Sequence, residues 1–358
     1  MDSHLTSSTK LLELLEIDAP IIQAPMAGVS TPEMAAAVSN AGALGSIGVG
    51  ATRADIARQM IVSFRERSSR SLNVNVFCHT PARADPAREA RWIERLRPEF
   101  ERLNATPPAV LKETYRSFLE DDEMLTMLLG ERPEIVSFHF GIPSRERVKA
   151  LHDAGIVLLG SATHVGEARA LVAADVDAVI AQGYEAGGHR GMFDPSADDD
   201  ALGTFALTRL LVREIDRPVI AAGGIMDGAG IAAVLRLGAS AAQLGTAFIA
   251  CDESQADPGY HAALRSDAAH HTVMTRAISG RPARSLPNRF TALGQKVAAH
   301  DLPDYPIAYD AGKALNSAGK ARGDLGFGAH WAGQGAPLSR ALPAGDLVAL
   351  LRREMVGE

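Results

Sequence analysis

The chain contains 358 residues, of which 46% are hydrophobic and 22% are charged, and its formal net charge is −7 at pH 7. This composition is that of an ordinary globular protein and excludes disorder as the main state. The modest acidity is spread along the chain, which argues against a nucleic-acid-binding face or a polybasic membrane patch. Cys78 and Cys251 are the only cysteines, so the sequence predicts neither a disulfide framework nor a metal site.

The segment from Met1 to Asp18 has no apolar core of the kind found in signal peptides. No apolar run reaches the ~18 residues that a transmembrane helix needs. We therefore expect a soluble protein of the cytoplasm.

Short apolar segments of strand length recur along the chain and end at glycine, proline or small polar residues. Most are apolar at successive positions, as parallel strands covered on both faces require. The eight predicted strands are Ala19–Met26, Ala43–Val49, Leu72–Cys78, Glu134–Phe140, Val157–Ala162, Ala178–Tyr184, Pro218–Gly224 and Ala241–Ile249.

Segments with helical periodicity alternate with these strands. The first opens with Thr31-Pro32, a capping residue followed by a residue suited to the first helical position. The predicted helices are Thr31–Ala41, Arg53–Arg67, Asp85–Leu103, Ser144–Ala154, His164–Ala173, Ala206–Glu214, Asp227–Leu237 and Ala344–Glu354. Eight strand–helix units in about 250 residues predict an α/β fold of the (β/α)8 TIM-barrel type, whereas an open doubly wound sheet usually stops near six strands.

Two segments break this alternation. His79–Pro133 is about twice the usual length, and we expect an extra helix at Ala109–Leu129. Cys251–Gly323 is too long for a loop, and its helical periodicity predicts helices at Gly259–Ile278 and Asp304–Ala318. We interpret residues 251–323 as a small helical cap inserted after strand eight, over a barrel formed by residues 1–250 and 324–358. Because barrel active sites lie at the carboxyl ends of the strands, such a cap would cover the site.

Glycines at the ends of strands seven and eight indicate a phosphate site. Gly223 and Gly224 end strand seven, and Gln243-Leu244-Gly245-Thr246 ends strand eight. Backbone N–H groups of such turns can approach a phosphate, and these two loops commonly bind one in barrels. The alternative is that the glycines only permit tight turns.

A second glycine motif overlaps this region. Gly228–Ala233 fits the G-x-G-x-x-A pattern of dinucleotide-binding folds. The acidic residues some twenty positions later, Asp252 and Glu253, follow strand eight instead of ending the next strand, so this interpretation is weak.

Strand six ends in a glycine-rich segment, Gln182–Gly191, which contains Gly187, Gly188 and His189. Four glycines within ten residues allow unusual backbone conformations or let a ligand come close to the backbone. Histidine can accept a proton or offer a positive charge near neutral pH, so His189 is the candidate catalytic residue. A surface histidine in a glycine loop is the alternative. Arg190 is interpreted as a solvated or structural charge, and Asp198–Asp200 as a solvated loop.

Polar residues also occur on other strands. Asparagine is rare in strands and a buried amide must be hydrogen-bonded, so Asn75 on strand three is a candidate ligand contact. A hydrogen bond inside the barrel explains it almost as well. His139, at the end of strand four, is interpreted as an interior histidine with satisfied hydrogen bonds.

The five tyrosines are concentrated outside the regular strands. Tyr305, Tyr309 and Lys313 follow one another at intervals of four and share one helix face. Tyr115 and Tyr260 lie in the two segments that break the alternation. This set could receive an anionic substrate, or it could pack the seam between cap and barrel.

Four motifs together resemble the class I nitronate monooxygenases, formerly called 2-nitropropane dioxygenases. The motifs are Ile22–Gly28, Asn73–His79, Ser137–Gly141 and Gln182–Gly191. The resemblance covers nearly the whole chain and implies an FMN-dependent barrel that oxidises alkyl nitronates, with propionate 3-nitronate as the expected substrate. The expected products are a carbonyl compound and nitrite or nitrate, formed by one-electron chemistry through a flavin semiquinone that O2 reoxidises.

The resemblance also assigns roles to residues. His189 takes the catalytic position, and Tyr115, Tyr260, Tyr305, Tyr309 and Lys313 resemble the substrate entrance. The residues implied in FMN binding are Gln23, Ala24, Pro25, Met26, Asn75, Gln182, Gly187, Gly188, Gly223, Gly224, Gln243, Leu244, Gly245 and Thr246.

Several alternatives stay open at this point. We expect His189 and Lys313 to favour the anionic nitronate, but with a neutral nitroalkane His189 would take the α-proton instead. A barrel that takes hydride from NAD(P)H, or a barrel that binds a phosphate ligand without catalysis, is also compatible with the sequence. The expected partners are a small anionic nitronate and O2, with no nucleic acid or membrane, and the chain is expected to be a monomer or a homodimer.

Overall fold

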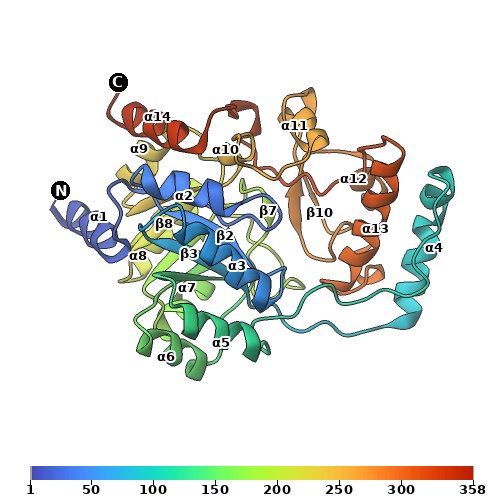
Figure 1. Cartoon of the computed structure of the whole chain (residues 1–358), viewed down its shortest axis with the longest axis horizontal. Helices are drawn as coiled ribbons and strands as arrows, with labels where there is room; N and C mark the ends of the chain where they lie inside the picture. The colour runs from blue at the N-terminus through green and yellow to red at the C-terminus, as the bar shows by residue number, and fades with distance from the viewer. Residues whose placement is uncertain (1, 358) are drawn as a thin grey trace.

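Eight parallel strands form the centre of the computed structural model, which describes residues 2–357 and, for their side chains, residues 8–357 (Figure 1). The strands are β1 (Ile21–Gln23), β2 (Gly45–Gly48), β3 (Leu72–Phe77), β4 (Ile135–His139), β5 (Val157–Ala162), β6 (Ala178–Gln182), β8 (Val219–Ala222) and β9 (Ala241–Leu244). Their order is β1-β9-β8-β6-β5-β4-β3-β2, and a parallel bridge between Ile22 and Leu44 joins β1 to the segment leading into β2. The sheet therefore closes into a barrel, and the predicted TIM-barrel fold is confirmed.

Helices surround the barrel on its outer face. They are α2 (Pro32–Asn40), α3 (Ala54–Arg65), α5 (Asp122–Glu131), α6 (Arg145–Asp153), α7 (Val165–Ala173), α8 (Thr204–Glu214), α9 (Gly228–Arg236) and α14 (Ala344–Val356). The start of α2 follows the prediction, because the Thr31 hydroxyl accepts a hydrogen bond from the Met34 N–H at 2.9 Å. Within residues 2–357, no helix combines the length and the apolar character needed to cross a bilayer.

The predicted strand Ala241–Ile249 is too long. β9 ends at Leu244, and Thr246–Ile249 form the short helix α10. The apolar run continues through both elements, so hydrophobicity alone does not mark the turn at Gly245 between them.

The amino-terminal helix α1 (Asp2–Leu15) was not predicted. Leu11 and Leu15 are fully buried against barrel residues such as Ile135 and Ala178, which begin their strands. The helix therefore closes the end of the barrel opposite the cap, as Figure 1 shows. Its apolar positions are few, and its stability comes from this tertiary packing.

The predicted cap, residues 251–323, contains two strands as well as helices. They are β10 (Val273–Thr275) and β11 (Ala283–Ser285), and β11 also pairs with β7 (Gly188–His189) of the segment after β6, which gives an antiparallel sheet in the order β10-β11-β7. The predicted helix Gly259–Ile278 is therefore wrong in its second half, because only α11 (Pro258–Leu264) and the short 3-10 helix η1 (Asp267–His270) form before β10. Pairing with β11 overrides the local helical pattern there.

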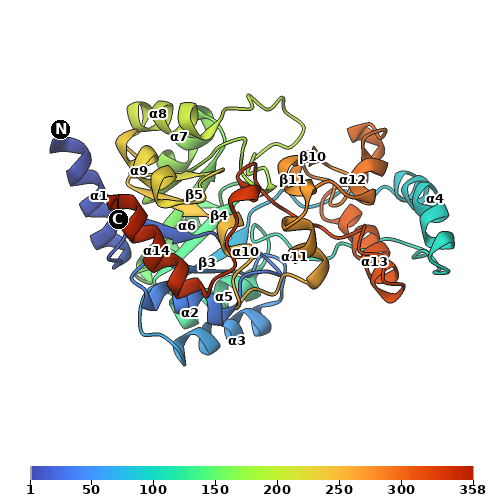
Figure 2. The same cartoon turned by 90° about the horizontal axis from the view of Figure 1, so that it is seen from above.

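The cap helices are α11, α12 (Arg289–Gly294) and α13 (Ile307–Ala321), with the 3-10 helix η2 (Ala299–Asp301) between α12 and α13. A further 3-10 helix, η3 (Ala336–Leu338), follows the cap and precedes α14. The helix predicted at Asp85–Leu103 forms as α4 (Pro86–Arg102), but it lies against α13 and away from the barrel (Figures 1 and 2). Trp92, Leu96 and Phe100 share a hydrophobic core with Leu315 of α13. The predicted cap, residues 251–323, does not contain α4.

The helix predicted at Ala109–Leu129 begins later than expected, because α5 starts at Asp122. The preceding residues form an extended segment beside the end of β3. The Phe118 N–H donates to the Phe77 carbonyl at 2.8 Å, and the Ser117 hydroxyl donates to the His79 carbonyl at 2.5 Å. These contacts replace helical hydrogen bonds and bring Tyr115 to the mouth of the barrel.

Candidate active site

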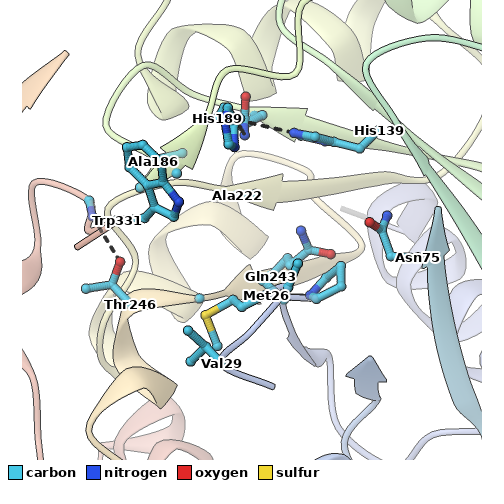
Figure 3. A pocket seen from close by; sticks show the side chains of 18 of the residues that line it. Met26, Val29, Asn75, His139, Ala186, His189, Ala222, Gln243, Thr246 and Trp331 are labelled. Atoms are coloured by element: carbon cyan, nitrogen blue, oxygen red, sulfur yellow. Dashed lines mark hydrogen bonds between the residues drawn. The ribbon is translucent and has the colours of Figure 1, made fainter. Parts of the chain in front are cut away.

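A cavity of about 420 Å³ lies at the carboxyl ends of the barrel strands, beneath the cap (Figure 3). Most of the predicted site residues line it, namely Ala24, Pro25, Met26, Asn75, Tyr115, Gln182, Gly187, Gly188, His189, Gly223, Gly224, Gln243, Gly245, Thr246, Tyr260, Tyr309 and Lys313. They come from strand ends that are distant in the sequence, and closure of the barrel brings them together.

Three predicted site residues lie behind this lining. Gln23 is fully buried, and its Nε2 donates to the Ser30 hydroxyl at 2.9 Å, so it supports the loop after β1. Leu244 is buried in the barrel core. The Tyr305 ring lies behind His189, with 5.4 Å between the ring centroids.

The glycine loops after β8 and β6 have no room for side chains. A Cβ on Gly223 would lie 2.8 Å from the Thr204 hydroxyl, and a Cβ on Gly187 would lie 2.4 Å from the Gly333 nitrogen. Gly223 and Gly224 also have φ values of +119° and +71°, which favour glycine. Because these glycines line the cavity, their backbone atoms border it, as a phosphate site requires.

A loop from the carboxyl-terminal part of the chain completes this end of the cavity. The Gly333 N–H donates to the Thr246 hydroxyl at 3.0 Å, as the dashed line at Thr246 in Figure 3 shows. Gly333 and Gly335 both line the cavity. Neither glycine belongs to a predicted motif, although the glycine-rich composition of residues 326–335 indicates a loop of this kind.

Three side-chain amides line the middle of the cavity. The Oε1 atom of Gln243 is buried and has no hydrogen-bond partner among the described residues. Asn75 uses its Nδ2 inside the barrel, donating to the Ser137 hydroxyl at 2.9 Å. The Nε2 of Gln182 donates to the His189 carbonyl at 2.9 Å. Gln243 therefore has unused acceptor capacity for a ligand, whereas Asn75 and Gln182 also stabilise the walls.

His189 is held on β7 by contacts on several sides. Its Nε2 lies 2.8 Å from the Ser279 hydroxyl, and its ring packs on Trp331 with 5.1 Å between centroids. Burial, together with the nearby His139, Arg281 and His79, lowers the pKa of His189 to about 3. The imidazole is thus neutral at physiological pH and has a free lone pair, although a pKa this low makes it a weak base.

His139 lines the cavity beside His189, and Figure 3 shows the two on the side opposite Gln243 and Met26. Its Nδ1 lies 3.1 Å from the Ser161 hydroxyl, and its Nε2 lies 3.3 Å from the His189 carbonyl. Since a carbonyl only accepts, Nε2 carries the proton and Nδ1 accepts from the serine. Burial lowers the pKa of His139 to about 4. His139 has the satisfied hydrogen bonds expected from the sequence, and it also reaches the cavity, which was not expected.

Arg281 places a buried positive charge behind the histidines. Its guanidinium lies 4.3 Å from the centroid of the Phe140 ring and 5.9 Å from that of Tyr305, and it donates to the Met192 carbonyl. Burial lowers the pKa of Arg281 to about 10, so it remains charged at neutral pH. This charge opposes protonation of His189.

The entrance combines aromatic rings with one ammonium group. The Nζ atom of Lys313 lies 4.9 Å from the Tyr115 ring centroid and 5.1 Å from that of Tyr309. Burial lowers the pKa of Lys313. Tyr260 donates a hydrogen bond to the Trp331 carbonyl. Among the described residues that line the cavity, Lys313 is the only lysine or arginine and none is acidic, so the entrance suits an anion, although the same tyrosines also pack the seam.

The G-x-G-x-x-A motif does not form a nucleotide site. The Gly228 N–H donates to the Glu354 carboxylate at 2.8 Å, and a Cβ on Gly228 would lie 2.3 Å from the Glu354 Cβ. The Asp227 carboxylate accepts from the Gly230 N–H at 2.8 Å. The start of α9 is therefore filled by α14 and by its own capping residue, and the dinucleotide interpretation is wrong.

The acidic run at residues 198–200 is not simply solvated. Asp199 forms an ion pair with Arg190, whose side chain is only 1% exposed, at 2.8 Å. Arg190 also donates to the Gln182 carbonyl at 2.8 Å. The pair fixes the glycine loop, so the structural interpretation of Arg190 is correct. Among the side chains of residues 8–357, no cluster of histidine, cysteine, aspartate or glutamate is suited to bind a metal.

No sequence pattern predicted a role at the site for Ser279, Arg281 or Trp331. Ser279 and Arg281 lie in the turn between β10 and β11, just beyond a segment predicted to be helical. Trp331 lies in an irregular loop after α13. Their positions depend on the pairing of β11 with β7, and no local sequence pattern predicts this pairing.

Comparison with known proteins supports one family. A family model described as nitronate monooxygenase matches residues 8–354. A nitronate monooxygenase from Paraburkholderia phytofirmans is 61% identical over 98% of this chain and 96% of its own length. One from Pseudomonas aeruginosa is 53% identical over 97% and 99%. The crystal structure of a nitroalkane oxidase from Streptomyces ansochromogenes has a TM-score of 0.89 and 42% identity, with 97% of each chain covered.

Proposed function

Because the chain belongs to the nitronate monooxygenase family, we propose that it is an FMN-dependent enzyme that oxidises alkyl nitronates with O2. The observation that carries this proposal is the neutral His189 beside a cavity where Lys313 is the only lysine or arginine among the described lining residues. The expected products are a carbonyl compound and nitrite or nitrate.

The residues around the cavity fit a flavin mononucleotide. The crowded glycine turns at Gly223 and Gly224, with Gly245 and Thr246, would hold the phosphate through backbone N–H groups. The unpartnered Oε1 of Gln243 would accept a hydrogen bond from the ring system. When bound, the flavin supplies the redox chemistry, while the protein supplies orientation and electrostatics.

The chain's own groups then have separate tasks. Lys313 attracts the negatively charged nitronate toward the cavity, and the neighbouring tyrosines offer hydroxyl donors. His189 is neutral, so it acts on substrate as a hydrogen-bonding group or as a proton acceptor. The cap covers the strand ends and limits the access of water.

We propose propionate 3-nitronate as the substrate. It carries a carboxylate in addition to the nitronate group, and Lys313 with Tyr115 and Tyr309 offers a cation and hydroxyl donors at the entrance. The cytoplasmic location and the choice between monomer and homodimer stay predictions.

The test is oxygen consumption by the purified protein after addition of propionate 3-nitronate. We expect a yellow protein that releases FMN on denaturation, identified by mass, and rapid oxygen uptake with the nitronate. A colourless protein, or a yellow protein with no oxygen uptake, would contradict the proposal. Anaerobic addition of NADH and NADPH is the control, since rapid bleaching of the flavin would indicate a reductase instead.

A further inference from the structure

The imidazole of His189 makes one side-chain hydrogen bond among the described residues. Its Nε2 lies 2.8 Å from the hydroxyl of Ser279, across 90 positions of sequence. Ser279 is 1% exposed and lies in the turn between β10 and β11. This contact is outside the cavity lining, so Ser279 acts on the substrate only through His189.

The surroundings of Ser279 give its hydroxyl proton a partner. The hydroxyl lies 3.3 Å from the Arg281 carbonyl, which can only accept a hydrogen bond, and 3.4 Å from the Arg281 N–H, which can only donate one. If the hydroxyl donates to that carbonyl, its lone pair accepts from an Nε2–H of His189. A neutral imidazole has only one N–H, so Nδ1 then carries the free lone pair. Nδ1 makes no hydrogen bond to any described residue.

Aromatic packing alone would not choose between the two orientations of the ring. His189 packs between Trp331 at 5.1 Å, Tyr305 at 5.4 Å and Phe140 at 5.6 Å, measured between ring centroids. A flip of the imidazole by 180° exchanges its nitrogens with carbons but hardly changes its shape. The hydroxyl of Ser279 distinguishes a nitrogen from a carbon and therefore selects one orientation.

We propose that Ser279 is a positioning residue that keeps His189 in the Nε2–H tautomer and leaves Nδ1 as the proton-accepting atom. This inference rests on the proposed function. With a nitroalkane, the Cα–H bond breaks, a bond from that proton to Nδ1 forms, and the electron pair remains on the substrate as the nitronate. His189 becomes a cation in this step, and it returns the proton to solvent afterwards.

The direct test is nitrogen-15 NMR of the FMN-loaded protein labelled at histidine, with the His189 signals assigned by their loss in His189→Asn. We expect the wild-type protein to have a protonated Nε2 and an unprotonated Nδ1. Ser279→Ala should give a mixture of tautomers, whereas Ser279→Thr, which keeps a hydroxyl, should retain the wild-type state. This measurement needs no turnover, so its result does not depend on whether the protein oxidises nitronates.

Kinetics provide a second readout. Ser279→Ala should lower kcat/KM for a neutral nitroalkane by about 10- to 100-fold, because the His189 imidazole is no longer held in one orientation and tautomer. Ser279→Thr should retain most of the wild-type kcat/KM. Activity on the preformed nitronate should change much less. The matched control is Ser285→Ala, which removes an equally buried cap hydroxyl whose hydrogen bonds among the described residues go to the carbonyls of Leu286 and His330. It should leave both activities and the NMR signals unchanged.

Two results would overturn the proposal. One is a wild-type protein in which Nδ1 carries the proton, which is measurable even if Ser279→Ala does not fold. The other is a folded Ser279→Ala variant with the wild-type tautomer and undiminished nitroalkane activity. Tautomer control by Ser279 without any nitronate oxidation would reject the proposed function while supporting the positioning role.

Discussion

His189 is surrounded by groups that oppose its protonation. It is buried against aromatic rings, and the guanidinium of Arg281 and two further histidines lie near it. An imidazole in such a setting stays unprotonated even at pH values far below neutral. It therefore offers a substrate a neutral lone pair and not a permanent positive charge, although an imidazole with so low a pKa is a weak base.

This distinction predicts the behaviour of His189→Asn on two related substrates. With a nitroalkane, whose α-proton must be removed, we expect kcat/KM to fall by about 10²- to 10⁴-fold, the usual contribution of a general base. With the preformed nitronate, we expect a loss of less than about tenfold, because no proton has to be removed. Steady-state oxygen uptake on both substrates measures the difference. Equal losses on the two would instead assign His189 to binding of the anion.

Lys313 predicts a different pattern, because its charge acts on binding. Lys313→Met should raise KM for propionate 3-nitronate by about 10- to 100-fold, as expected for the loss of a charged hydrogen bond, with a smaller change in kcat. The matched control is Lys320→Met on the same helix, which removes an ion pair with Asp257 at 2.7 Å, outside the cavity lining. Similar increases in KM for both variants would mean that general electrostatics, and not the entrance, are responsible.

At the scale of the elements, the turn after β8 depends on the absence of a side chain. Gly223→Ala places a Cβ 2.8 Å from the Thr204 hydroxyl, in a residue whose φ is +119°. We expect the variant to fold but to retain much less FMN, because the turn that we propose to hold the phosphate must shift to accommodate the Cβ. The ratio of flavin absorbance to protein absorbance measures this loss.

The control for that experiment is Gly130→Ala in α5, where a Cβ would meet no atom within 4 Å. It should retain full flavin content, with unchanged or slightly higher stability. Full flavin retention in Gly223→Ala would contradict the assignment of the phosphate to this turn.

The same elements explain what could be predicted from sequence. The barrel strands and the glycine turns at Gly223 and Gly187 are local features, because apolar runs and missing side chains leave a pattern within a few residues. The turn that carries Ser279 has no such pattern, and its partner His189 is 90 residues away in the chain. The helix α1 was missed for a related reason, since Leu11 and Leu15 acquire their burial only from the assembled barrel.

At the scale of the whole molecule, buried neutral histidines link stability to pH. The pKa values of His79, His139 and His189 lie at about 3, 4 and 3, against an ordinary value of 6.5, and burial also lowers the pKa of His330. Below pH 6.5 the unfolded chain binds protons that the native protein does not bind. The stability from these groups is therefore fully present above about pH 6.5 and is lost as the pH falls toward their native pKa values.

We therefore expect the free energy of unfolding to fall by about 1.4 kcal/mol for each of His79, His139 and His189 between pH 7.5 and 5.5, or about 4 kcal/mol for the three together. Urea unfolding at a fixed excess of FMN measures this change. His79→Gln should remove about one third of it, because His79 is fully buried and neither ring nitrogen has a hydrogen-bond partner among the described residues. His300→Gln, at a side chain that is 84% exposed, should leave the pH dependence unchanged. If His79→Gln keeps the full pH dependence of the free energy of unfolding, the loss of stability comes from aspartate and glutamate carboxylates and not from histidines that are held neutral between barrel and cap.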